Sequence, residues 1–393
     1  MPDPPVCDTT ELADAIRKIA MEEGFIACGI APAVNSEGFA DLVRWIDAGY
    51  PADMDYFANR LDAYRHPEGV LPGAKSVVVL AWPYSARDSE PGDCSDAAFA
   101  KVARYTWQGT DYHDVIHPKL KRIRQMIQTR CPDANARGIV DTAPLMEREV
   151  AQLAGMGWRG KNTLLLNRTL GSYFFLACVL VDVELPTDSP HESDHCGTCT
   201  ACLDACPTNA FVGPHVLDAS RCISYLTIES RETIPEPLRE GIGDWVFGCD
   251  VCQEVCPWNR KPTRHAMADD AREESDWLLS PDTPRGLLEL GKLFELDEDA
   301  FRKRFRKSPM WRTRRRGLLR NAAIVIGNTG TQKQVPALIL GMRDPEPIVR
   351  ASCVWAARQI VERDAPNDSV IQKELARLHQ EEHDGLVREE LDR

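Results

Sequence analysis

Eight cysteines between residues 196 and 256 constrain this chain more than any other feature of its sequence. Four follow the spacing C-x2-C-x2-C-x3-C-P, three follow the spacing C-x2-C-x3-C-P, and one stands alone between the two runs. The first spacing is typical of ferredoxins with two [4Fe-4S] clusters, in which the fourth cysteine of the run binds the other cluster. Because soft thiolates suit iron–sulfur clusters, the sequence predicts two [4Fe-4S] clusters and therefore electron transfer.

The crossed pattern of ligation divides the eight cysteines into two sets of four. The first cluster is expected to be bound by Cys196, Cys199, Cys202 and Cys256. For the second cluster, the two runs supply only Cys206, Cys249 and Cys252. The isolated Cys222 is expected to be its fourth ligand. Structural zinc sites also use four cysteines, but this spacing is poor for zinc knuckles. A disulfide framework would need an oxidising compartment, and the N-terminus shows no signal peptide.

The rest of the composition describes a large chain without membrane segments. Its 393 residues suggest two or three domains, and no apolar run approaches the roughly 20 residues that span a bilayer. We therefore expect a soluble cytoplasmic protein that makes no membrane contact. The six other cysteines receive no catalytic role, and Cys28, Cys178 and Cys353 lie in apolar surroundings that predict small core residues.

Charge is distributed unevenly along the chain. The net charge of −13 argues against a protein that coats nucleic acid over its whole surface. Ten Lys or Arg residues and no acid nevertheless lie between Arg302 and Arg320, after an acidic stretch over residues 269–299. Such a basic patch suggests a localised anionic partner such as RNA. The alternative, a solvated helix face, stays open.

Three segments are predicted from the order of the elements. Residues 1–189 alternate helical and strand signals, which indicates an α/β domain. Residues 190–262 contain the ferredoxin-like cluster region. Residues 263–393 comprise a linker and helices, in which residues 320–327 align with residues 350–357 at an offset of 30 residues. Stacked helix pairs of the HEAT type explain this repeat, and an unrelated helical tail is the alternative.

Asp141 is the strongest candidate for acid–base chemistry. It follows a short strand at residues 138–140 and precedes a helix expected over residues 145–154. A carboxylate at the carboxyl end of a strand can face the crevice where α/β proteins bind ligands. The alternative is an N-cap of the following helix, and position alone leaves both open. Further candidates for a pocket are Arg60, Arg65, Arg104, Tyr112 and His113.

Several long motifs, in the same order, closely resemble those of epoxyqueuosine reductases. The resemblance covers essentially the whole chain, and a ferredoxin pattern alone would not carry it. The matching runs are DTAPLMEREVA (141–151), GWRGKNTLLLN (157–167), DHCGTCTACLDACPTNAF (194–211), LDASRCISYLTIE (217–229), GCDVCQEVCPWN (248–259) and RRRGLLRNAAIVIGN (314–328).

The resemblance implies an enzyme that reduces epoxyqueuosine to queuosine at the wobble position of a tRNA anticodon. It implies cobalamin in the N-terminal α/β domain, electrons that pass through the two clusters from an unidentified low-potential donor, and Asp141 as the proton donor. We expect a monomer. Residues implied to surround the corrinoid or the substrate base are Asp141, Arg104, Lys161, Asn162, Ser172, Ser224, Asp250 and one of Arg60 and Arg65. Residues implied to bind the tRNA backbone are Arg312, Arg314, Arg315, Arg316 and Arg320.

Two other classes of protein share part of this pattern. A corrinoid reductive dehalogenase also combines cobalamin with two clusters, but such enzymes usually carry an export signal and no basic helical tail. A ferredoxin-like electron carrier would leave about 190 N-terminal residues unexplained. Whether cobalt acts by inner-sphere attack or outer-sphere electron transfer, and whether cobalamin loses its lower ligand, stays open at this level.

Overall fold

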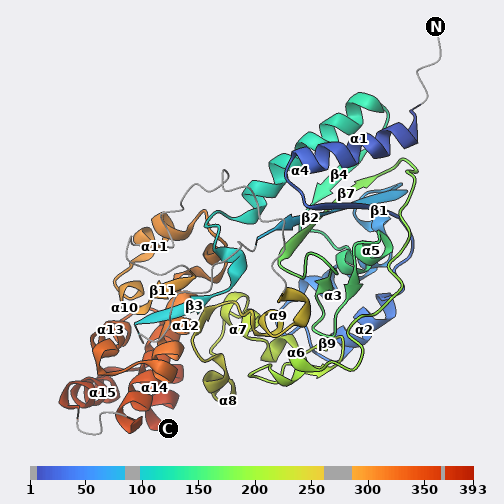
Figure 1. The fold of residues 1–393 in the computed structure, drawn as a ribbon. Coiled ribbons are helices and arrows are strands. Elements are labelled where there is room, and N and C mark those ends of the chain that lie inside the picture. Colours follow the sequence, from blue (N-terminus) through green and yellow to red (C-terminus); the bar gives the residue numbers. More distant parts are fainter. Residues whose placement is uncertain (1–6, 85–97, 261–285, 364–367) are drawn as a thin grey trace.

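The computed structural model describes residues 7–84, 98–260, 286–363 and 368–393 (Figure 1). Most of the acidic linker lies outside the described residues. Within the described residues, no helix is both long enough and apolar enough to cross a membrane.

A four-stranded antiparallel sheet forms the centre of the N-terminal part. Its strands, in spatial order, are β1 (Ala27–Pro32), β2 (Ser76–Pro83), β7 (Phe174–Val181) and β4 (Ala136–Ile139). Alternate residues of β2 point to opposite faces, so Val78 and Leu80 join one apolar core and Val77 and Val79 join another. The α/β prediction is confirmed, although every strand pair in this sheet is antiparallel.

Helices cover both faces of this sheet (Figure 1). Helices α1 (Thr9–Glu22) and α4 (Tyr112–Arg130) pack on the face of Val78 and Leu80, and α5 (Glu147–Leu153) packs on the other. A disulfide joins Cys7, just before α1, to Cys131 at the end of α4, a pairing that the sequence did not predict. Shorter helical elements precede β2, and they are α2 (Phe39–Asp47), α3 (Tyr56–Asn59), η1 (Leu61–Arg65) and η2 (Pro67–Gly69).

A second, three-stranded sheet draws strands from distant parts of the chain. Strand β3 (Phe99–Val102) pairs in parallel with β10 (Trp245–Phe247) and antiparallel with β11 (Leu287–Glu289). The three predicted segments, residues 1–189, 190–262 and 263–393, each supply one of these strands. The turn η3 (Arg104–Thr106) follows β3 and leads toward α4.

The cysteine-rich part (residues 190–260) and the β5–β6 hairpin before β7 are built mostly from short elements. They are β5 (Trp158–Arg159), β6 (Leu165–Leu166), α6 (Ala201–Asp204), β8 (Phe211–Gly213), β9 (Val216–Leu217), η4 (Ala219–Arg221), α7 (Ile223–Ile228), α8 (Glu236–Arg239), η5 (Glu240–Ile242), α9 (Val251–Glu254) and η6 (Pro257–Asn259).

Helices form the C-terminal part. They are α10 (Leu290–Leu293), α11 (Glu298–Phe305), η8 (Pro309–Thr313), α12 (Arg314–Thr329), η9 (Gln332–Gln334), α13 (Val335–Gly341), α14 (Pro347–Arg363), α15 (Ser369–Glu381) and α16 (Gly385–Asp392). Helices α12 and α14 contain the two predicted repeat segments, and most residues of each are buried in one core that also includes residues of β3 and α7.

Candidate active site

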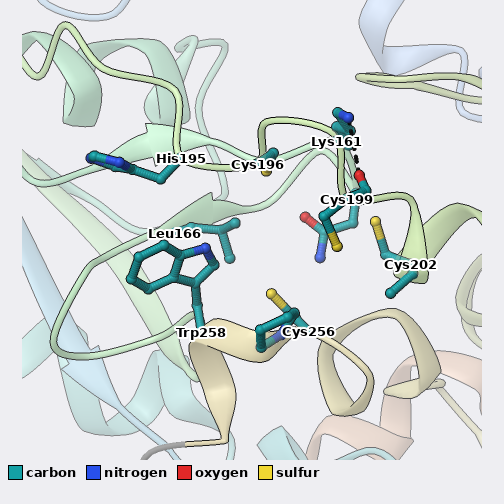
Figure 2. A pocket seen from close by; sticks show the side chains of 11 residues that line it. Lys161, Leu166, His195, Cys196, Cys199, Cys202, Cys256 and Trp258 are labelled. Atoms are coloured by element: carbon teal, nitrogen blue, oxygen red, sulfur yellow. Dashed lines mark hydrogen bonds between the residues drawn. The ribbon is translucent and has the colours of Figure 1, made fainter.

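Four cysteines from the two runs surround one cavity of about 210 Å³ (Figure 2). The sulfur atoms of Cys196, Cys199, Cys202 and Cys256 point toward one another across it. Cys196 and Cys199 come from the loop that leads into α6, Cys202 lies in α6, and Cys256 precedes Pro257 at the start of η6. The grouping is the one expected from crossed ligation, and the cavity offers four thiols to a polynuclear group.

The other four cysteines also lie together. Cys206 and Cys222 lie close enough to Cys249 for their charges to raise its pKa. Cys206 acts on the pKa of Cys222 in the same way, as do Cys222 and Cys249 on that of Cys252. Burial raises the pKa of Cys222, Cys249 and Cys252, so these thiols would stay protonated without a cationic partner. A bound metal deprotonates a coordinating thiol, which makes this buried set suitable for a cluster. Among the described residues, no three His, Cys, Asp or Glu side chains are placed to hold a single metal ion.

Two residues predicted near the cofactor contact the cysteine loops. The ammonium group of Lys161 donates hydrogen bonds to the carbonyl oxygens of Gly197 (2.6 Å) and Cys199 (3.0 Å). The amide of Asn162 donates to the carbonyl oxygen of Cys252 at 3.3 Å. A single turn after β5 therefore ties both groups of cysteines to the sheet domain.

Ser224, also predicted near the cofactor, lies in the first turn of α7. Its hydroxyl and the backbone N–H groups of Ser224 and Tyr225 lie near the Cys222 sulfur and favour its thiolate, although burial outweighs them and raises the pKa of Cys222. The structure thus places Ser224 against the second group of cysteines.

Asp141 occupies a loop at the end of β4 in a conformation that few residues adopt. Its φ of +40° lies in the left-handed region, where Asp is among the better tolerated residues. The side chain accepts hydrogen bonds from the Tyr112 hydroxyl and from His113 Nε2, the latter at 3.0 Å. The first turn of α4 therefore holds both carboxylate oxygens of Asp141, and its side chain is 42% exposed.

The structure decides against the alternative role of Asp141 as a helix cap. Helix α5 begins at Glu147, its N-cap residue is Met146, and no side chain caps it. The Asp141 carboxylate is thus engaged by α4 and not by the helix that follows it in sequence. Glu147 faces the same loop, and burial and the charge of Asp141 raise the pKa of this carboxyl to about 8.

Aromatic rings line the same end of the sheet. Tyr112 stacks on Phe175 at the start of β7, with ring centres 4.0 Å apart. Tyr105 makes edge contacts with both of these rings, and Tyr84 at the end of β2 contacts Phe175 and Tyr173. Apolar, aromatic walls of this kind suit a planar macrocycle or a nucleobase.

Arg104, Ser172 and Asp250 belong to one polar network next to this wall. The Arg104 backbone N–H donates to Asp250 Oδ2 (2.6 Å), and the Ser172 hydroxyl donates to Gln253 Oε1 (2.9 Å). Gln253 in turn donates to Asp250 Oδ1 (3.0 Å), which joins the two pairs. Burial raises the pKa of Asp250 to about 6. Sequence reasoning missed Gln253 and its neighbour Asn259, which lie in the second cysteine motif and could have been identified from it.

Two buried polar atoms beside this network lack a hydrogen-bond partner within the described structure. They are Nε of Arg104 and Oε1 of Glu147. Native proteins rarely leave such atoms unpaired unless a ligand or water satisfies them. A corrinoid carries amide groups around its rim that both donate and accept hydrogen bonds, so the residues present fit such a group.

The two arginines between which the sequence could not choose lie elsewhere on the surface. The Arg65 guanidinium packs over the Phe39 ring at 4.1 Å and lies 3.9 Å from Asp62. Arg60 is exposed and forms no ion pair with any residue in the described ranges. Both side chains are exposed, and Arg65 differs from Arg60 by its contacts with Phe39 and Asp62.

The basic stretch divides into exposed and buried arginines. Arg312, Arg314 and Arg316 are exposed, although Arg312 also pairs with Glu229 at 2.8 Å. The prediction that Arg315 and Arg320 bind tRNA is wrong for this structure because both are buried. Arg315 forms a two-point ion pair with Asp344, and Arg320 donates to the carbonyl oxygens of Leu226, Ser230 and Glu232.

Comparison with known families identifies a double [4Fe-4S] domain and relatives that are epoxyqueuosine reductases. A family described as "4Fe-4S double cluster binding domain" matches residues 195–259, and "Epoxyqueuosine reductase QueG, DUF1730" matches residues 65–142. The chain is 41% identical to the epoxyqueuosine reductase of Pseudomonas aeruginosa over 90% of its own length and 95% of the relative's. It is 37% identical to that of Escherichia coli over 91% of each chain.

Solved structures agree over nearly the whole chain. A crystal structure of epoxyqueuosine reductase with a tRNA-Tyr epoxyqueuosine-modified stem loop has a TM-score of 0.84 at 28% identity and covers 97% of both chains. The enzyme from Bacillus subtilis, in a structure with its catalytic aspartate loop swung out of the active site, has a TM-score of 0.82 at the same identity and coverage.

The chain therefore has the sequence and fold of an oxidoreductase with a double [4Fe-4S] domain. It belongs to the epoxyqueuosine reductase family.

Proposed function

We propose that this chain reduces epoxyqueuosine to queuosine at the wobble position of tRNA anticodons, in the cytoplasm and as a monomer. Membership of the epoxyqueuosine reductase family carries the proposal. The structural match to a relative in complex with an epoxyqueuosine-modified stem loop supports a tRNA substrate for this chain as well.

Two [4Fe-4S] clusters serve the reaction as an electron path from a low-potential donor. The eight cysteines form two groups of four, and we assign each group to one cluster: Cys196, Cys199, Cys202 and Cys256 to the first, and Cys206, Cys222, Cys249 and Cys252 to the second. Lys161 and Asn162 support these loops through hydrogen bonds to their backbone, and Ser224 lies near the Cys222 sulfur. These three residues thus act on the clusters and hold the electron path against the sheet domain.

Cobalamin is proposed to bind between the aromatic wall and the cysteine-rich part. Arg104, Ser172 and Asp250 supply polar groups there, and the unpaired Arg104 Nε is available to a corrinoid amide. Arg60 is the better of the two arginine candidates because its guanidinium is not engaged by neighbours. When bound, cobalamin supplies a strongly reducing centre beside the substrate.

Asp141 supplies the proton that the opening of the epoxide requires. Breaking a C–O bond of an epoxide leaves negative charge on oxygen, and a positioned carboxylic acid can neutralise that charge as it develops. Asp141 lies at the end of the sheet beside the aromatic wall, partly exposed and able to reach a substrate. Tyr112 and His113 fix its orientation through hydrogen bonds to both carboxylate oxygens.

The tRNA is proposed to lie across the exposed arginines near this site. Arg312 in η8 and Arg314 and Arg316 in the first turn of α12 form this exposed row, and phosphate contacts of this kind give affinity without sequence specificity. The charge of Arg312 acts on Asp141, which places this row close to the catalytic loop. We propose that the helices after it form HEAT-like repeats that extend the contact surface.

One assay tests the function. Anaerobically purified protein with reconstituted clusters is mixed with cobalamin, a low-potential reductant and tRNA that carries epoxyqueuosine, and the digested nucleosides are analysed by mass spectrometry. We expect loss of one oxygen only when cobalamin, reductant and protein are all present. Absence of conversion with iron and cobalt both bound would contradict the proposal and favour a small-molecule corrinoid reductase.

A further inference from the structure

The reaction proposed above needs more protons than Asp141 alone can hold. Conversion of an epoxide to an alkene breaks two C–O bonds, forms a C=C bond and releases the oxygen as water. The balance requires two electrons, which a low-potential donor supplies through the clusters, and two protons. A carboxylic acid carries one proton, so a second group has to recharge Asp141 within each turnover.

His113 is placed to do this. Its Nε2 lies 3.0 Å from Asp141 Oδ1, and its Nδ1 lies 2.8 Å from Asp111 Oδ1 on the other side of the ring. Carboxylate oxygens accept hydrogen bonds and do not donate them, so both ring nitrogens act as donors when both carboxyls are ionised. The geometry is that of an imidazolium held between two carboxylates.

The surroundings keep a proton on this ring. Burial alone would lower the pKa of His113, but the hydrogen bonds to Asp111 and Asp141 and the charges of both carboxylates outweigh it and raise the pKa to about 9. Arg312, whose charge acts on Asp111 and Asp141, and His117, whose ring stacks on that of His113, also face this region. The side chain is 23% exposed, so water can restore its proton.

Asp111 is fixed in its role by the helix. It is the N-cap of α4 and accepts a hydrogen bond from the His113 backbone N–H at 3.0 Å. Burial alone would raise the pKa of Asp111. Hydrogen bonds from His113 and the charge of Arg312 outweigh burial and leave this pKa below its usual value. Tyr112 differs from His113, because burial and the charge of Asp141 raise the pKa of its hydroxyl far above neutrality. Tyr112 can orient Asp141 but does not give up its proton.

We propose that His113 is a positioning residue and proton store that recharges Asp141 between the two protonations of the epoxide oxygen, with Asp111 holding the ring. The inference rests on the proposed function. The proton moves from His113 Nε2 to Asp141 Oδ1, which leaves a neutral imidazole with its remaining N–H toward Asp111. Asp141 then passes the proton to the oxygen, His113 takes a new proton from water, and a second transfer releases the oxygen as water.

The pH dependence of turnover tests this relay. In the wild-type enzyme, kcat should fall as pH rises through about 9, where His113 loses its proton. His113→Gln keeps a donor for Asp141 but carries no titrating proton, so we expect kcat to fall by about 10²-fold and this alkaline decline to disappear. KM for tRNA should change by less than about twofold, since the group acts on chemistry and not on binding.

Further variants separate the relay from a purely structural role. Asp111→Asn removes one carboxylate and should move the alkaline decline to lower pH. Added imidazole should restore part of the activity of His113→Ala. His117→Gln is the matched control, because this ring stacks on His113 at 5.9 Å without touching Asp141, and its pH profile should be that of the wild type. A His113→Gln enzyme with wild-type kcat and alkaline decline would overturn the relay alone, whereas a wild-type enzyme that fails to convert the tRNA would overturn the function as well.

Discussion

Asp141 combines an unusual backbone conformation with a carboxylate held from two sides, and this makes a conservative test possible. Asparagine tolerates a φ of +40° as aspartate does, so Asp141→Asn should keep the loop in place. It removes the transferable proton, and we expect kcat to fall by at least about 10²-fold while iron and cobalt contents stay unchanged. Asp47→Asn, at the exposed end of α2, is the matched control. Unchanged turnover in Asp141→Asn would remove this residue from the mechanism.

Glu147 offers a second prediction at the scale of single residues, this time for stability. Its pKa is about 8 in the folded protein and about 4.5 when unfolded, so the folded state binds more protons between these values. Stability from this group is therefore present below pH 4.5 and is lost as pH rises to about 8. Glu147→Gln mimics the protonated form, and its melting temperature should exceed that of the wild type by at least about 2 °C at about pH 8.5. The difference between the two proteins should shrink toward about pH 5, and a constant difference would contradict the assignment.

At the scale of elements, the internal repeat explains why Arg320 of the basic stretch is structural. Arg320 in α12 aligns with Arg350 in α14, and each donates to backbone carbonyl oxygens. Arg320 is fully buried, and burial lowers its pKa to about 9. When a basic residue recurs at the same position of two packed helices, its side chain has an equivalent structural role in both. The alignment therefore contained a sign that Arg320 does not face solvent.

The exposed arginines of the same helix start should behave differently. Arg314→Glu with Arg316→Glu should weaken tRNA binding and make the dependence of log Kd on log salt shallower by about one unit for each phosphate that is no longer neutralised. The visible spectrum of the clusters should not change, because neither side chain contacts the cysteine loops. Lys373→Glu on α15 combined with Arg388→Glu on α16 makes the same change of charge at exposed positions elsewhere and serves as the control. Equal affinities of the double variant and the control for tRNA would show that this row is not the docking surface.

At the scale of the whole molecule, the sequence predicted local chemistry better than long-range arrangement. Cysteine spacing anticipated which thiols gather, and the alternation of helical and strand signals anticipated an α/β domain, because both signals reside in neighbouring residues. The antiparallel order of the sheet and the pairing of β3 with β10 and β11 depend on contacts between distant segments, which no local pattern encodes. The hydrogen bonds of Asp141 with the first turn of α4 also join distant segments, so the sequence did not predict them. Tyr112 and His113 were recognised as candidates, but their partner lies 28 or more residues away.

The crossed grouping of the cysteines is also a property of the whole molecule, and double variants can test it. If Cys196 and Cys256 bind one cluster, replacing both with alanine should remove one cluster and leave about four of about eight iron atoms. Replacing Cys196 and Cys206 should damage both clusters and leave little iron. Ligation within each run would reverse the two results. Iron and acid-labile sulfide per chain, measured after anaerobic reconstitution, distinguish the cases. Cys28→Ser is the control, because this cysteine lies in β1, outside both groups, and its iron content should equal that of the wild type.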